Sequence, residues 1–282
     1  MTATALESVL RRDRAIVAAA LAVLTALAWV YIVLLANSMA AGGMSMGDMP
    51  MSNMPMGDSS GMNMGGVLAP AFKPWTAVEF TTTFAMWTVM MVGMMTPSAA
   101  PMILIYARVG RQAALQGKPF AATGFFAGGY LLAWSLFSLV ATGGQWALDR
   151  AALLTPMMAT TSGVLGGLVL IAAGLFQWSP VKDVCLKHCR APLSFIQHHG
   201  GFRRDAAGSL ALGFRHGTYC VGCCWALMAA LFVGGVMNIV WIAGLAIFVL
   251  LEKVIPAGRI VSRAAGAALI VWGVWLMASA LR

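Results

Sequence analysis

Long apolar segments alternate with short polar stretches over most of the chain. Most of these segments reach the roughly 20 residues that a helix needs to cross the hydrocarbon core of a bilayer. We predict seven transmembrane helices near residues 15–36, 80–105, 121–147, 157–178, 208–234, 238–256 and 260–280. Glycine-rich strings inside these segments, such as GVLGG and GFFAGGY, are typical of closely packed membrane helices. The pattern therefore predicts an all-α, polytopic transmembrane bundle.

Composition supports the same fold class. The 282 residues are 60% hydrophobic and only 10% charged, and the mean hydropathy is +0.83. A soluble domain carries roughly 25% charged residues, so this chain has too little charge to cover a soluble surface. Contact with membrane lipid removes that requirement.

Basic residues give the bundle an expected orientation. Most of the 18 Lys and Arg residues lie at the N-terminus and in the connections 106–120, 179–215 and 253–263. Cytoplasmic loops carry such an excess, which favours an odd number of spans and a cytoplasmic N-terminus. The net charge of +9 therefore requires no nucleic-acid partner.

Three regions follow from this topology. We expect residues 1–36 to form a retained signal-anchor helix, because its apolar run is longer than that of a cleaved signal peptide. We expect residues 37–78 to form a flexible periplasmic loop. Residues 79–282 would then form a six-helix membrane domain with a cytoplasmic Cys/His loop at 179–207.

The expected periplasmic loop is rich in methionine, with nine methionines between residues 39 and 64. Thioethers are soft, neutral ligands that suit copper(I) and need no deprotonation. Closely spaced methionines on a flexible loop can wrap several sulfurs around one ion. We therefore predict copper capture there, with a low-complexity tether as the alternative; the candidate ligands are Met44, Met46, Met49, Met51, Met54 and Met56.

Soft ligands also occur inside two predicted spans. On a helix, Met90, Met91, Met94 and Met95 share one face, where methionine could equally fill gaps in a core. The fifth span places His216, Cys220, Cys223 and Cys224 within nine residues and on one face. Polar groups in a membrane are costly and usually functional. This span therefore predicts a soft-metal site for copper(I), or less favourably zinc, against the alternative of packed cysteines.

The loop at 179–207 adds Cys185, His188 and Cys189, which can share a face of a helical turn as a second metal site or be incidental to a basic loop. Glu252 is the sole acidic residue of the last two spans. It could form a local ion pair with Lys253, anchor the helix at the membrane interface, or support the metal ligands from behind.

Four strings resemble a family of bacterial proteins known as domain-of-unknown-function family 2182: MWTVMMVGMMTPSAAPM, FQWSPVKDVCLKHCRAP, GTYCVGCCWALM and GGVMNIVWIAGLAIFVLLEKVIPAG. Its members are described as predicted metal-binding integral membrane proteins. The resemblance covers roughly residues 75–280. It implies a role in metal binding for the following residues: Met90, Met91, Met94, Met95, Cys185, Cys189, Cys220, Cys223, Cys224 and Glu252.

The leading hypothesis is a copper(I)-binding membrane protein for copper acquisition, transport or delivery, working with a copper chaperone or a cuproprotein complex. The alternatives are a membrane metalloenzyme or accessory subunit of a copper-dependent oxidase or monooxygenase, and a structural subunit whose cysteines only pack. No phosphate-binding loop, Ser/His/Asp constellation or convincing carboxylate pair is apparent in the sequence.

Overall fold

The fold is all-α, as the sequence predicts. A computed structural model describes residues 5–44, 75–117, 121–155 and 158–282. The helices that it contains are α1 (Ala5–Met44), α2 (Ala77–Leu115), α3 (Thr123–Arg150), α4 (Gly163–Phe176), α5 (Pro180–Arg190), α6 (Pro192–His198), α7 (Ala206–Ala229), α8 (Leu231–Gly234), α9 (Ile239–Val254) and α10 (Gly258–Ala280). α1 continues to Met44, beyond its expected end at residue 36.

Helix length separates the predicted spans into two groups. Five segments are long and apolar enough to cross a membrane: Ala15–Met39, Ala77–Leu115, Thr123–Arg150, Ala206–Gly234 and Gly258–Ala280. α4 and α5 meet the same criterion only as a pair, and they are bent by 64°. α9 has 16 residues and rises about 24 Å, less than the roughly 30 Å of a hydrocarbon core. Length and composition therefore give five candidate spans in the described part of the chain, or six with the bent pair, and do not confirm the predicted seven.

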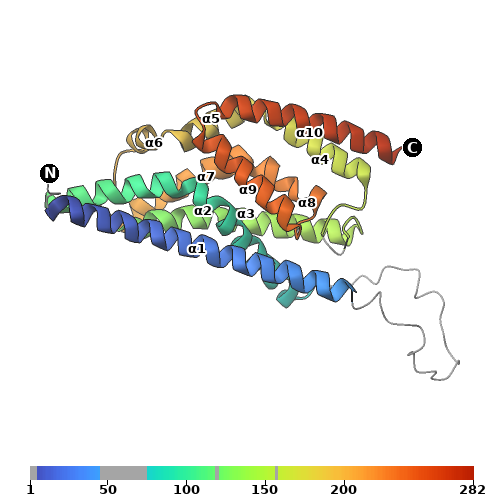
Figure 1. Ribbon diagram of the computed structural model, residues 1–282, viewed down its shortest axis with the longest axis horizontal. Coiled ribbons are helices and arrows are strands. Elements are labelled where there is room, and N and C mark those ends of the chain that lie inside the picture. Colours follow the sequence, from blue (N-terminus) through green and yellow to red (C-terminus); the bar gives the residue numbers. More distant parts are fainter. Residues whose placement is uncertain (1–4, 45–74, 118–120, 156–157) are drawn as a thin grey trace, which may run out of the picture.

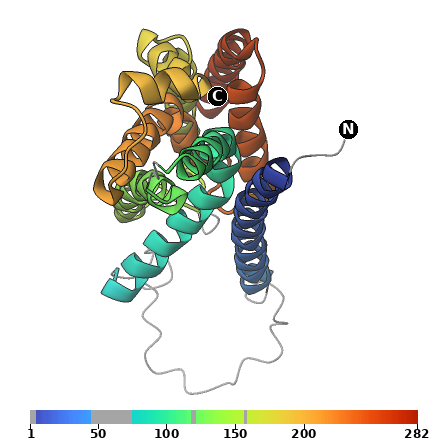
Figure 2. The same cartoon turned by 90° about the vertical axis from the view of Figure 1, so that its left-hand side faces the viewer.

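The long helices lie side by side along the longest axis of the molecule, with the start of α1 and the end of α10 toward opposite ends of that axis (Figure 1). α1 lies at the edge of the bundle against α2, as the turned view shows (Figure 2). Many large apolar side chains point outward, including Val140 and Ile260, each 71% exposed. Exposed apolar residues on several sides fit a surface covered by lipid rather than water.

A proline inside α2 leaves a backbone carbonyl free to bond to α1. Pro97 lies inside α2 and has no backbone N–H, so the carbonyl of Gly93, four residues earlier, loses its helical donor. The indole Nε1 of Trp29 donates to that carbonyl at 3.3 Å. Gly93 also allows close contact, because a Cβ there would lie 3.2 Å from the Cβ of Ala28.

Glycines bring two further helix pairs into backbone contact, which confirms the expected packing role of the glycine-rich strings. Between α3 and α7, a Cβ on Gly129 would lie 2.0 Å from the carbonyl oxygen of Leu210, and a Cβ on Gly213 would lie 1.9 Å from that of Phe126. Between α4 and α10, a Cβ on Gly167 would lie 2.6 Å from the carbonyl oxygen of Gly273. These contacts fix α7 against α3 and so position the cysteine-bearing face of α7.

Candidate functional site

The cysteine-bearing face of α7 is buried in the centre of the bundle. α7 begins after Asp205, whose side chain accepts a hydrogen bond from the amide of Gly208. Cys220, Cys223 and Cys224 are at most 1% exposed. The thiols of Cys223 and Cys224 both donate to the carbonyl oxygen of Cys220, at 3.0 Å each. The predicted grouping on one helical face is therefore present in the structure.

A fourth thiol reaches this group from α5. α5 begins after Ser179, which accepts from the amide of Lys182, and has Pro180 at its start. Near the end of α5, the thiol of Cys189 interacts with the thiols of Cys220 and Cys223. We call Cys189, Cys220, Cys223 and Cys224 the thiol cluster. The sequence placed Cys189 in a separate loop site, whereas the fold brings it to the site on α7.

The approach of α5 to α7 depends on Gly222. A Cβ at this position would lie 3.0 Å from the Sγ of Cys185. Cys185 is half-buried and packs against the core beside the thiol cluster. A larger residue at position 222 would therefore crowd the Sγ of Cys185 at the level where the thiols of α5 and α7 meet.

The sequence interpretation missed two residues at the thiol cluster, Lys253 and Tyr130. The Nζ of Lys253 donates to the Sγ of Cys220 at 2.8 Å and to the Oγ of Ser98 at 3.0 Å. The hydroxyl of Tyr130 lies 3.2 Å from the same sulfur and donates to the carbonyl of Met95 at 3.1 Å. A positive charge in the last turn of an apolar helix was the available signal, because such a charge needs a partner.

Glu252 points to a different partner from its neighbour. It is fully buried, and its Oε1 lies 2.6 Å from the Nζ of Lys182 on α5. The suggested local ion pair with Lys253 is therefore wrong, since adjacent residues on a helix do not face each other. Lys182 also donates to Gln177, which accepts from Ser262 at 3.1 Å. This polar group ties α5 to α9 and α10.

The methionines of α2 form part of the core beside the thiol cluster. Met90, Met91, Met94 and Met95 are each at most 1% exposed. The hydrogen bonds that connect this helix to the cluster involve the carbonyl of Met95 and the hydroxyl of Ser98, not a thioether. Burial of this face is expected both for methionines that pack the core and for methionines that bind a metal ion. Metal binding by these thioethers therefore stays a prediction.

Three of the four histidines, His188, His199 and His216, gather in an aromatic group against the middle of α7. The Nδ1 of His216 has no hydrogen-bond partner among the described residues, and its ring lies between those of Phe126, Tyr130 and Phe195. His188 stacks on Tyr219 with ring centroids 4.4 Å apart, and its Nδ1 lies 2.8 Å from the carbonyl of Val184. His188 is thus engaged by the aromatic group rather than by the thiols.

The Cys and His candidates in the described part of the chain do not form a preorganised site of three or more metal ligands. There, no group of three or more His, Cys, Asp or Glu side chains has an arrangement that could hold a metal ion. Met44 is the last residue of α1, and its side chain is not described. The other loop candidates lie outside the described residues: Met46, Met49, Met51, Met54 and Met56.

Comparison with known proteins identifies a family. No curated protein and no solved structure matches the chain. The model of the family PpoB2, described as copper chaperone, matches residues 84–276. That range contains most of α2 and extends into α10, and it therefore includes the thiol cluster, Lys253 and the buried methionines. The match supports the predicted copper-related function, but it does not confirm the name of domain-of-unknown-function family 2182. Since the match covers more than half of the sequence, the chain belongs to the PpoB2 copper chaperone family.

Proposed function

We propose that this protein is a membrane copper chaperone that binds copper(I) as cargo between the thiols of α5 and α7. The observation that carries the proposal is the interaction of Cys189 with Cys220 and Cys223, which joins a half-buried thiol of α5 to two buried thiols of α7. Thiolates are soft ligands that select copper(I). The description of the family as copper chaperone supports the same cargo.

Two thiolates are enough for the proposed complex. Copper(I) accepts low coordination numbers, so binding does not require a preformed group of three ligands. One copper(I) with two thiolates carries one net negative charge, and the ammonium of Lys253 beside Cys220 balances it. In a poorly solvated interior an unbalanced charge is costly. A third thiol of the cluster or a thioether of α2 could then join by a change of side-chain rotamer.

The route of the cargo follows from the predicted topology. We propose seven spans with a cytoplasmic N-terminus in a bacterial inner membrane, which the distribution of basic residues supports. The methionine-rich segment would collect copper(I) on the periplasmic side, and Met90, Met91, Met94 and Met95 would offer thioethers within the bundle. Cys185 lies beside Gly222 at the level of the thiol cluster, and His188 lies against Tyr219, so both would be near the cargo as it leaves the cluster. A cuproprotein or a soluble copper carrier would be the exchange partner.

The test is a copper(I) affinity measurement on the full chain in detergent, by competition with a chromophoric copper(I) chelator. The variants are Cys220→Ser/Cys223→Ser/Cys224→Ser and, as a control on the exposed side of the same helix, Ala211→Ser. We expect the triple variant to lose the tightest binding while Ala211→Ser retains it. Equal affinities in protein that elutes as a folded species on size exclusion would refute the thiol site.

A further inference from the structure

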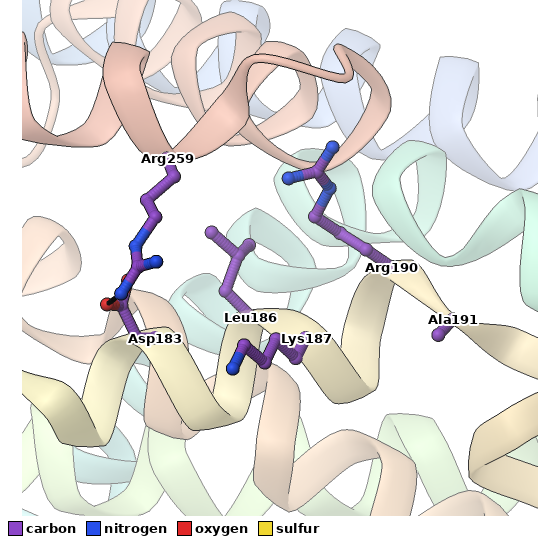
Figure 3. Close-up of a pocket in the computed structure, with 6 residues that line it drawn as sticks. All are labelled: Asp183, Leu186, Lys187, Arg190, Ala191 and Arg259. Atoms are coloured by element: carbon purple, nitrogen blue, oxygen red, sulfur yellow. Dashed lines mark hydrogen bonds and ion pairs between the residues drawn. The ribbon is translucent and has the colours of Figure 1, made fainter.

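A positively charged cavity opens on the other side of α5, away from the thiol cluster. Its volume is about 360 Å³, and it lies between α5 and the first turn of α10 (Figure 3). The residues that line it are Asp183, Leu186, Lys187, Arg190, Ala191 and Arg259. They include three cationic side chains and a single carboxylate, so the cavity carries an excess of positive charge.

The one carboxylate is already engaged. Asp183 pairs with Arg259, as the side chains drawn in Figure 3 show. Arg190 is held by neutral acceptors, because its Nη2 donates to the carbonyls of Ile255 at 2.7 Å and Pro256 at 2.9 Å. Within the described part of the chain, the cationic groups of Lys187 and Arg190 have no carboxylate partner. Both charges are therefore available to an anion in the cavity.

The turn between α9 and α10 holds Arg190 in a fixed place. A Cβ on Gly258 would lie 3.2 Å from the Nη1 of Arg190, so the guanidinium lies directly against this glycine. α10 starts at Gly258, and Ala257 before it supplies no side chain to cap the helix. The first-turn amides of α10 add positive potential at the same end of the cavity. The cationic groups are thus organised without a ligand.

The position of the cavity fits the level of lipid headgroups. α9 ends at Val254 and α10 begins at Gly258, so the cavity lies at the shared end of these two helices. α5 is amphipathic and bends by 64° from α4, and it exposes Val181 and Val184 beside the charged side chains. Such a helix typically lies along a membrane surface with its apolar residues in the acyl region.

We propose that this cavity binds the phosphate of an anionic phospholipid headgroup. Lys187, Arg190 and Arg259 supply the charge, and the exposed valines of α5 contact the acyl chains. Basic pockets at the ends of membrane helices suit such headgroups. The proposal is independent of copper binding. It has one structural consequence: the lipid would hold α5 from the side opposite to Cys185 and Cys189.

The experiment is native mass spectrometry of the full chain released from detergent. The protein is incubated with equal amounts of phosphatidylglycerol and phosphatidylcholine. We expect one phosphatidylglycerol to be retained preferentially, and Lys187→Gln to lower that retention about fivefold. Arg150→Gln, at the far end of α3, is the matched charge control and should have no effect.

Inorganic phosphate forms a separate arm of the same experiment. If the site takes a lipid headgroup, millimolar phosphate leaves the retained phosphatidylglycerol in place. Displacement of the lipid by phosphate at that concentration would overturn the lipid assignment in favour of a free anion. Equal retention of the two lipids would also overturn the proposal, as would unchanged retention in Lys187→Gln. Lys187 is exposed, so its substitution should not prevent folding.

Discussion

The ammonium of Lys253 lies 2.8 Å from the Sγ of Cys220, in the interior of an apolar helix bundle. The carboxylate next to it in the chain, Glu252, is paired with Lys182 instead. A buried ammonium needs compensation, and the nearest group that can carry negative charge is a thiol that we assign as a copper ligand. Lys253 therefore links the charge balance of the site to its cargo.

Replacing Lys253 with methionine removes this charge while keeping a long side chain. A hydrogen bond to a charged group contributes about 1.5–3 kcal/mol, so we expect Lys253→Met to weaken copper(I) binding about tenfold or more. Competition with a chromophoric chelator measures the change. Lys253→Arg keeps the charge and should retain most of the affinity.

Arg204→Met serves as the control for loss of a positive charge, because Arg204 is exposed in the connection before α7. Its copper(I) affinity should equal that of the wild type. If Lys253→Met also binds copper(I) with wild-type affinity, Lys253 takes no part in balancing the bound complex.

Gly222 lies where α5 packs against α7 beside the thiol cluster. Since a Cβ there would lie 3.0 Å from the Sγ of Cys185, we expect Gly222→Val to separate the helices and to reduce oxidative cross-linking of Cys189 to Cys220 or Cys223. Peptide mass spectrometry after mild oxidation of the apoprotein with diamide measures the cross-linked fraction.

Gly244→Val is the matched control on α9, because a Cβ at Gly244 meets no atom within 4 Å. It should cross-link as the wild type does. An unchanged cross-linked fraction in Gly222→Val would mean that the approach of α5 does not depend on the missing side chain.

Two adjacent glycines of α3 provide a test of the fold itself. A Cβ on Gly129 would lie 2.0 Å from the carbonyl oxygen of Leu210, whereas a Cβ on Gly128 meets nothing within 4 Å. Overpacking costs about 1–3 kcal/mol, and backbone overlap of this size should reach at least the upper end. We expect Gly129→Ala to lower the thermal stability in detergent and Gly128→Ala to leave it unchanged or slightly raised. Equal unfolding temperatures would contradict the described α3–α7 contact.

The buried pair of Lys182 and Glu252 should matter more for stability than the partly exposed pair of Asp183 and Arg259. Glu252→Gln leaves the ammonium of Lys182 buried without its counter-charge, which costs about 3–5 kcal/mol. Asp183→Asn breaks a pair in which the arginine side chain is 55% exposed, and such surface pairs contribute about 0–1 kcal/mol. Denaturant unfolding in detergent measures the loss of unfolding free energy in each of the two variants. A smaller loss for Glu252→Gln than for Asp183→Asn would show that the buried pair is misassigned.

Helical spacing along the sequence predicted which residues share a face of one helix. It could not predict contacts between side chains of different helices. Hydropathy gave the all-α bundle, and helical spacing grouped Cys220, Cys223 and Cys224. The approach of Cys189 could not be predicted, because it depends on the 64° bend before α5 and on the small size of Gly222. The partner of Lys253 depends in the same way on the contact between α9 and α7. Hydropathy also overstated the length of the helix at 239–254, since an apolar stretch need not be helical throughout.

The central claim is that thiols from α5 and α7 together hold copper(I), and X-ray absorption at the copper edge tests it most directly. The full chain is loaded with one equivalent of copper(I), alongside Cys189→Ser and Cys220→Ser. We predict a first shell made of sulfur in the wild type, with one sulfur lost or replaced by a lighter atom in each variant. A first shell of nitrogen or oxygen in the wild type, or a sulfur shell that neither substitution changes, would contradict the account.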